Sequence, residues 1–203
     1  MKRFLKLWLC LVFAAAMQAT AQTDKPVMHS YAFDDGGILT GMSDNGLWAV
    51  ASATNSSNTL ILENPRLLGV DSGTELLLSE GYEEGKSLNC GANDVTNDGN
   101  VVVGRFGGLP AVWRRTGETS GAWTQLPVPD GYDGGMVNAV TPDGKYAVGV
   151  ATTSTNILLE KEVMWDLTTN AILPTPGLPA KDAAHLDQGQ SRFTAISADG
   201  RYV

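Results

Sequence analysis

The sequence predicts an all-β protein built from repeated short antiparallel strands, and three observations support this. One hairpin pattern occurs four times, with turns at residues 43–46, 96–99, 141–144 and 197–200. The strand after each turn alternates bulky and small side chains, and further apolar segments follow it. Self-similarity at a spacing of this kind is typical of stacked repeat units.

The third turn, Thr141-Pro142-Asp143-Gly144, shows why the pattern bends the chain. Proline presets φ for the first corner of a turn, and aspartate tolerates the second corner and can bond its own backbone. Glycine takes the left-handed conformation at little steric cost. This order predicts a type I turn that is closed by a glycine bulge.

The strand that follows each turn glycine keeps the same register in every copy. In the third copy, Tyr146 and Val148 alternate with Ala147 and Gly149, so that one face is bulky and the other is small. Two residues after the turn glycines stand Trp48, Val101, Tyr146 and Tyr202, and five residues after them stand Ala51, Gly104 and Gly149.

Other apolar segments complete each unit. They precede the turns at 93–95, 137–140 and 193–196, and they follow at 59–63, 110–114 and 162–167 and again at 123–127 and 171–174; further strand candidates are 67–70 and 74–78. The turn glycines are 53, 45 and 56 residues apart. Four short strands in a unit of this length predict antiparallel blades of an incomplete β-propeller-like domain. A β-helix and an irregular sandwich are the alternatives.

These residues carry a family resemblance. The Asp-Gly hairpin, the strand that ends in Gly or Ala and the later Trp resemble extracellular HAF-type repeats. Thr141-Pro142-Asp143-Gly144-Lys145-Tyr146 is also similar to the WD40-like propeller repeats of the Tol–Pal translocation protein family. The resemblance covers residues 38–203 and implies a propeller-like fold. The His-Ala-Phe of the first family is absent, and Ala111-Val112-Trp113 and Val163-Met164-Trp165 stand in its place.

Residues 1–21 are predicted to be a signal peptide. Lys2, Arg3 and Lys6 precede an apolar run that is too short for a comfortable bilayer span, and Ala19-Thr20-Ala21 has the form of a cleavage site. We therefore expect cleavage after Ala21 and a protein that is secreted, periplasmic or held at the cell surface.

The predicted mature chain, residues 22–203, is long enough for one repeat domain with a sizeable core. Loss of the three N-terminal cations takes the net charge from −8 to −11, which argues against nucleic acid as a partner. No membrane span is expected after signal removal. The chain stops within the fourth repeat, so the domain is expected to be truncated at its C-terminus.

No catalytic residue, metal site or cofactor is predicted, and the sequence does not identify binding residues. Repeated acidic turns can bind calcium, but Asn45, Asp98, Asp143 and Asp199 offer about one carboxylate each, and turn geometry alone accounts for them. Cys90 is expected to pack as a small residue at a strand end. His29 and His185 show no spacing typical of a site.

A few other residues carry weaker alternatives. Trp123 or Tyr132 could stack on a sugar, and Asp130 with Asp133 could form a carboxylate pair for glycoside hydrolysis, although their loop is rich in glycine. Trp113 and Trp165 are expected to pack between blades.

The sequence favours an exported, non-enzymatic repeat protein that binds a protein or a glycan. The alternative is a propeller-type glycoside hydrolase or lyase, with its site on missing blades or on the central channel. In that case Asp94, Asn138 and Thr194 on the first strands would face the channel. A purely structural part of a larger surface protein is a third possibility, and the fold alone does not decide among the three.

Overall fold

The computed structural model describes residues 37–54, 62–78, 89–154, 160–175 and 191–203. The chain divides into two compact units, Met1–Tyr31 and Ala32–Val203, and the first lies wholly outside the described residues. The predicted signal peptide and His29 therefore lie outside them, and His185 lies outside them as well, within residues 176–190. The part of the chain that is described contains no helix with the length and hydrophobicity that a membrane crossing requires.

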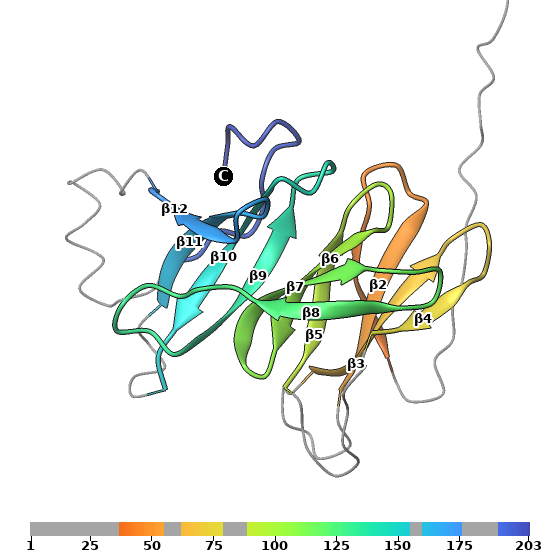
Figure 1. Ribbon diagram of the computed structural model, residues 1–203, viewed down its shortest axis with the longest axis horizontal. Coiled ribbons are helices and arrows are strands. Elements are labelled where there is room, and N and C mark those ends of the chain that lie inside the picture. Colours follow the sequence, from red (N-terminus) through yellow and green to blue (C-terminus); the bar gives the residue numbers. More distant parts are fainter. Residues whose placement is uncertain (1–36, 55–61, 79–88, 155–159, 176–190) are drawn as a thin grey trace, which may run out of the picture. The chain divides into compact units, whose positions relative to one another are not determined.

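The described residues form twelve strands in three four-stranded sheets, which we call blades 1, 2 and 3 (Figure 1). Blade 1 contains β1 (Ile38–Met42), β2 (Trp48–Thr54), β3 (Leu62–Gly69) and β4 (Glu75–Leu77); blade 2 contains β5 (Gly91–Val95), β6 (Val101–Phe106), β7 (Leu109–Arg115) and β8 (Gly121–Gln125); blade 3 contains β9 (Gly134–Val140), β10 (Tyr146–Thr152), β11 (Glu160–Asp166) and β12 (Ala171–Leu173).

Within each blade the strands pair in chain order, and all pairs are antiparallel. Successive blades belong to successive copies of the repeat. The predicted fold class, all-β with repeated four-stranded antiparallel blades, is confirmed.

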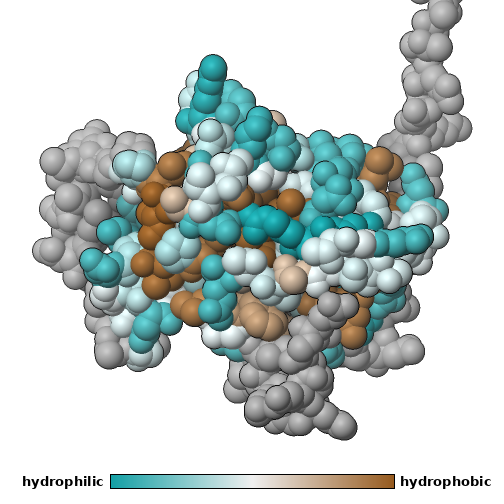
Figure 2. Space-filling view, in the orientation of Figure 1, coloured by the Kyte–Doolittle hydropathy of each residue, from teal (hydrophilic) through white to brown (hydrophobic). Residues whose placement is uncertain are grey.

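The cores lie where one blade meets the next. One cluster joins Val50 and Leu67 of blade 1 to Trp113 of blade 2, and the other joins Val103 of blade 2 to Trp165 of blade 3. The interior strand β10 is buried on both faces from Ala147 to Ala151, and Ala147 and Ala151 belong to the cluster that it shares with blade 2. The predicted packing of the two tryptophans between blades is confirmed. At the molecular surface, Figure 2 shows apolar residues gathered on the side of β11 and β12, where Ile172 is exposed.

The prediction for the third strand of blade 1 was wrong in its position. Segments 59–63 and 67–70 were expected to be separate strands, but β3 runs from Leu62 to Gly69 as one strand. In the three blades the equivalent positions of the second and third strands pair in the same way. The pairs are Ala49 with Leu68, Val102 with Trp113 and Ala147 with Trp165. Leucine therefore takes the place of tryptophan in this blade, and residues 59–61 lie outside the described residues.

The fourth copy also differs from expectation, since no strand forms at 193–196 or 201–203. In the other copies the first strand pairs with the second strand of the same blade. Only Arg201, Tyr202 and Val203 follow the fourth turn glycine in this chain. The turn itself nevertheless closes, with the Tyr202 carbonyl accepting from the Ser197 amide at 2.9 Å, because its bonds are local.

Candidate functional site

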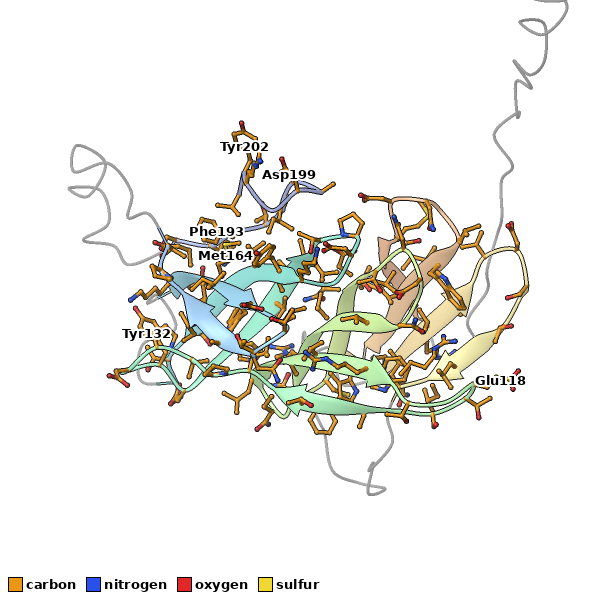
Figure 3. All side chains as sticks on the ribbon, turned by 45° about the horizontal axis from the view of Figure 1, so that its top comes forward. Glu118, Tyr132, Met164, Phe193, Asp199 and Tyr202 are labelled. Atoms are coloured by element: carbon orange, nitrogen blue, oxygen red, sulfur yellow. The ribbon has the colours of Figure 1, made fainter. Side chains whose placement is uncertain are left out.

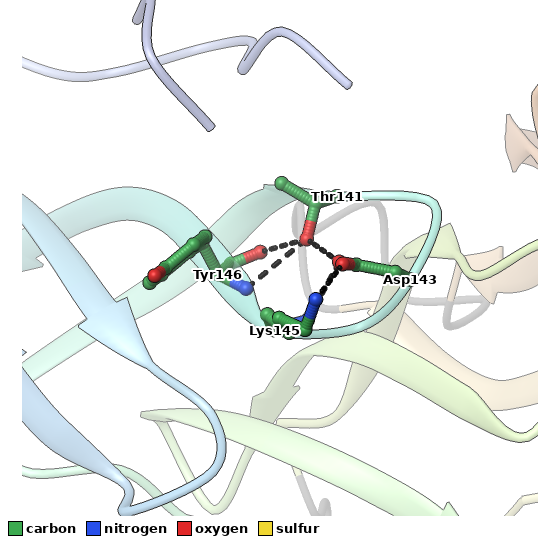
Figure 4. A network of polar contacts seen from close by, with 4 residues as sticks. All are labelled: Thr141, Asp143, Lys145 and Tyr146. Atoms are coloured by element: carbon green, nitrogen blue, oxygen red, sulfur yellow. Dashed lines mark hydrogen bonds and ion pairs between the residues drawn. The ribbon is translucent and has the colours of Figure 1, made fainter. Parts of the chain in front are cut away.

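Each turn between the first two strands of a repeat is held by the same set of hydrogen bonds, drawn for the third turn in Figure 4. The Thr141 hydroxyl donates to Asp143 Oδ1 at 2.8 Å and accepts from the Tyr146 amide at 3.1 Å. The same carboxylate oxygen accepts from the Lys145 amide at 3.1 Å. Gly144 closes the turn with φ of 72° and an amide that donates to the Thr141 carbonyl at 2.8 Å, as the predicted turn requires.

The other three turns repeat this network. The hydroxyl donates to the acidic or amide side chain two residues on at 2.8 Å from Ser43, 2.6 Å from Thr96 and 2.7 Å from Ser197. It accepts from the amide five residues on at 3.0 Å from Trp48, 3.1 Å from Val101 and 2.9 Å from Tyr202. The serine or threonine and the aspartate or asparagine are therefore structural parts of the turn.

The protonation of the turn carboxylates follows from these bonds. The hydrogen bonds from Lys145 and then Thr141 lower the pKa of Asp143 to about 2. Burial raises the pKa of Asp98, but the bonds from Thr96 and Asn100 outweigh it, so that the net shift is downward. The carboxylates are thus charged and already satisfied by their own turns. Among the described residues there is no group of three His, Cys, Asp or Glu side chains placed to hold a metal ion.

The Thr141→Val variant is expected to lose about 1–2 kcal/mol of stability, because a buried hydroxyl that both donates and accepts is removed. Urea unfolding followed by circular dichroism measures the loss. Thr141→Ser is the matched control, since Ser43 and Ser197 make the same bonds in other turns. Equal stability of the valine and serine variants would contradict a structural role for the hydroxyl.

The turns present an exposed row of side chains, which we call the turn face. It consists of the exposed residues Asp44, Asn45, Leu47, Asp98, Asn100, Asp143, Lys145, Ala198, Asp199 and Arg201. Neighbouring turns touch: Asn45 Nδ2 donates to the Asn97 carbonyl at 2.8 Å, and the Asn97 amide donates to the Pro142 carbonyl at 3.2 Å. The row is therefore continuous across the first three turns, which lie at the top of Figure 1.

A second set of polar residues links the first strands of successive blades. Thr40 Oγ1 donates to the Ala92 carbonyl at 2.5 Å, Asn93 Nδ2 to Val137 at 2.7 Å and Asn138 Nδ2 to Phe193 at 2.6 Å. Each donor stands six residues before its turn glycine, at the position where the strand register shifts. The extra residue of a bulge leaves the ladder and turns its side chain aside, here toward the next repeat.

Asp94 lies beside these hydrogen bonds between the first strands, and its pKa is unusual. Its Oδ2 accepts from the Val140 amide of blade 3 at 2.9 Å, and its Oδ1 accepts from the Val95 amide at 2.9 Å. Burial is the largest influence and raises the pKa of Asp94 to about 6, against the lowering effect of these two bonds and with a small contribution from the charge of Asp44. A raised pKa suits a general acid, but both oxygens already accept backbone hydrogen bonds.

Asp94 predicts a pH dependence of stability. Its folded pKa lies above its ordinary value of 3.8, so the folded state binds the proton more tightly than the unfolded state. The stabilisation is complete below pH 4 and is lost as the pH rises through 6, by about 3 kcal/mol in total. Between pH 4 and 7, urea unfolding should show that the free energy of unfolding falls with pH more steeply in wild type than in Asp94→Asn. The control variant Asp44→Asn should keep the wild-type dependence on pH. Parallel profiles for wild type and Asp94→Asn would contradict the burial of the carboxyl.

The other residues singled out from the sequence are used in packing or in loop contacts. Trp123 stacks on Phe106 with ring centroids 5.9 Å apart and donates from Nε1 to the Leu78 carbonyl at 2.6 Å. Tyr132 packs against the core cluster of blades 2 and 3. Asp133 accepts from the amide and hydroxyl of Ser154, and Asp130 is exposed. Cys90 is buried.

Under the enzyme alternative, Asp94, Asn138 and Thr194 were expected to face a central channel; the structure gives them different surroundings. Asp94 and Asn138 bond to the following repeat, and Thr194 is exposed. Thr40 and Asn93 were missed as linking residues. The signal was present in the sequence: a polar side chain stands six residues before the turn glycine in all four copies.

Comparison with known proteins gives similarity in solved structures only. No family model matches the chain, and no curated protein matches it. A structure described as a TolB protein of Agrobacterium tumefaciens is 18% identical with a TM-score of 0.47, covering 68% of this chain and 48% of that one. Hydrazine synthase of Kuenenia stuttgartiensis is 16% identical with a TM-score of 0.41, covering 66% and 35%. The chain thus spans about half the length of the first and about a third of the second.

Proposed function

We propose that this chain is an exported, non-enzymatic repeat protein that binds another protein through the turn face, at the cell surface or in the periplasm. The supporting observation is the contrast between the residues that hold each turn and the side chains that the turns expose. The hydroxyl, the acidic or amide residue and the glycine recur in all four turns, whereas the residue after the glycine is Leu47, Asn100, Lys145 or Arg201. The recurring turns hold different side chains in a fixed row, and a pre-organised row of this kind suits recognition of one particular protein surface.

The charges of the turn face define the partner further. Lys145 pairs with Asp143 at 2.8 Å and Arg201 with Asp199 at 3.6 Å, so the third and fourth turns are nearly neutral. Asp44 and Asp98 give the first two turns an acidic character beside exposed Leu47. A partner with basic side chains around an apolar residue would complement this end of the row.

A protein partner is favoured over a glycan by the state of the tryptophans. Sugars stack on exposed aromatic rings, but Trp113 and Trp165 are fully buried. Trp48 lies under Arg115, whose Cζ is 4.9 Å from the ring centroid, and Trp123 is stacked on Phe106. Of the four described tryptophans, two are thus fully buried and two are half-buried with the ring stacked on a neighbouring side chain.

Photo-crosslinking in the producing cells tests the proposal. A photoreactive amino acid at position 47 or 145, on the turn face, is expected to give a discrete crosslinked protein band. The control is position 118, exposed in the β7–β8 hairpin and distant from Asp199 and Tyr202 in Figure 3. Equal crosslinking at position 118, or none at positions 47 and 145, would overturn binding through this face.

Export is tested separately, by N-terminal sequencing of the protein recovered from each cell fraction. The residues of the predicted signal peptide lead us to expect an N-terminus at Gln22 outside the cytoplasm. An intact Met1 in a cytoplasmic fraction would refute export and leave the binding face to be judged by the crosslinking result alone.

The raised pKa of Asp94 is the one observation that favours the alternative, a glycoside hydrolase or lyase. Against it stand the two backbone hydrogen bonds that occupy the carboxylate. A reducing-end assay on a panel of polysaccharides decides: activity that disappears in Asp94→Asn would support the enzyme and replace the binding proposal.

A further inference from the structure

The first turn carries an asparagine where the other three turns carry Asp98, Asp143 and Asp199. This residue, Asn45, is the only asparagine of the sequence that precedes a glycine, and it is exposed. An asparagine followed by glycine is especially prone to form a succinimide, because no side chain shields the glycine amide nitrogen. The chemistry of the pair therefore singles out Asn45 among the turn residues.

The folded turn holds both reacting groups in hydrogen bonds. The Gly46 amide, which is the nucleophile of the reaction, donates to the Ser43 carbonyl at 2.9 Å. Asn45 Oδ1, on the carbon that is attacked, accepts from the Ser43 hydroxyl at 2.8 Å and from the Leu47 amide at 3.1 Å. Attack requires the amide to give up its proton and the side chain to turn toward it, so the turn must open first.

Two further hydrogen bonds tie Asn45 to the second turn. Its backbone amide donates to Asn97 Oδ1 at 3.0 Å, and its Nδ2 donates to the Asn97 carbonyl at 2.8 Å. Nδ2 is also the leaving group of the reaction, so the group that links the two turns is lost on conversion. An ionised aspartate accepts hydrogen bonds but donates none, and its oxygen would face the Asn97 carbonyl oxygen.

The other three turns are less reactive, because Asp-Gly forms the same succinimide readily only from an uncharged carboxyl group. The hydrogen bonds from Lys145 and Ser197 lower the pKa of Asp143 and Asp199, respectively, so both carboxyls are charged at neutral pH. A bulky side chain of the preceding repeat also lies against each of these turn glycines: Trp48 at Gly99, Val101 at Gly144 and Tyr146 at Gly200.

We propose that Asn45 is a spontaneous modification site, controlled by opening of its turn, whose conversion to aspartate or isoaspartate disconnects the first turn from the second. The Gly46 nitrogen bonds to Asn45 Cγ, the Cγ–Nδ2 bond breaks, and the Gly46 amide proton leaves with Nδ2 as ammonia. Water then opens the succinimide. Its attack at Cγ gives aspartate, and its attack at the backbone carbonyl carbon of residue 45 gives isoaspartate, with no oxidant or reductant involved.

Conversion changes the turn face in charge and in backbone. Asp44 and Asp98 are already exposed at this end of the row, and a third carboxylate joins them. The aspartate product can keep the bonds inside its own turn, as Asp98 does, whereas isoaspartate inserts a methylene group into the backbone of that turn. Both products lack the donor that Asn45 offers to the Asn97 carbonyl.

Timed peptide mapping tests the site. The purified full chain is kept folded in mildly alkaline buffer, and its digests are separated by chromatography and read by mass spectrometry. Residue 45 is expected to convert faster than any other asparagine of the described residues, but at least about tenfold more slowly than in the same chain unfolded in urea. An intact Asn45 in the folded chain, or conversion as fast as in urea, would overturn the proposal.

Asn97→Ala tests the link between the turns, because it removes the acceptor of the Asn45 amide. Conversion of Asn45 should become about fivefold faster, while circular dichroism should show an unchanged fold. Asn100→Ala is the matched control: it removes an amide side chain of the same turn that donates to Asp98 Oδ2 at 2.9 Å, and it should leave the rate unchanged. Equal rates in Asn97→Ala and wild type would contradict control by this link.

Asn45→Asp reproduces the aspartate product and tests the disconnection. In hydrogen exchange, protection of the residue 45 amide should fall at least about fivefold, because the contact with Asn97 is weakened. The Thr96 amide, which donates to the Val101 carbonyl within the second repeat, should keep its wild-type protection. Unchanged protection at residue 45 would show that the turns stay connected, and the proposal would fail.

Discussion

Replacement of Gly149 by valine is expected to lower the free energy of unfolding by at least about 3 kcal/mol, since it adds a side chain where two strands already touch. A Cβ on Gly149 would lie 2.2 Å from the Met136 carbonyl oxygen and 2.8 Å from Val137 Cα. Both are backbone atoms of β9, so they cannot turn away as a side chain would. Valine must therefore push β9 from β10 and break the ladder between them.

Urea unfolding, followed by tryptophan fluorescence, measures this loss. Thr124→Val is the matched control, because it introduces the same side chain at an exposed position of a strand and should change stability by no more than about 0.5 kcal/mol. A loss below 1 kcal/mol for Gly149→Val would contradict this argument, because it would show that β9 and β10 can move apart with little loss of stability. Gly104→Val should behave like Gly149→Val, since its Cβ would lie 1.9 Å from the Gly91 carbonyl oxygen.

The alternation of bulky and small residues was readable from the sequence, but the reason for the small ones was not. Gly104 and Gly149 are small because the bulged first strand brings its backbone against them. A bulge shifts the strand register by one residue, and an asparagine at position 93 or 138 does not by itself predict a bulge. The bulky residues were likewise visible, whereas their partner, the turn glycine of the next repeat, appears only when the repeats are stacked.

The turns were the most predictable part, because their hydrogen bonds connect residues no more than five apart. Blade 1 was harder: its third strand carries Leu68 in place of tryptophan and contains Pro65. Asp94 was noticed as a polar residue on a first strand, but its raised pKa depends on burial between blades. Burial of that kind is a property of the assembled repeats and leaves no local pattern.

Trp165→Ala is expected to lower the free energy of unfolding by about 3–5 kcal/mol. Trp165 is fully buried, lies in one cluster with Val103 and Val112 of blade 2, and donates from Nε1 to the Pro127 carbonyl at 2.8 Å. Alanine removes the ring that fills the boundary and leaves that carbonyl without its donor. Trp165→Phe is the control that keeps most of the packing; it should lose about 1–2 kcal/mol, mainly from the missing hydrogen bond.

Hydrogen exchange can locate the damage, because stacked repeats are stabilised by the contacts between neighbours. Trp165 belongs to the boundary between blades 2 and 3, whereas Trp113 belongs to the boundary between blades 1 and 2. In Trp165→Ala the amides of β9 and β10 should therefore lose protection before those of β2 and β3, and in Trp113→Ala the order should reverse. If both variants lose protection uniformly along the chain, the blades unfold as a single cooperative unit, and the division into separate boundaries does not describe their stability.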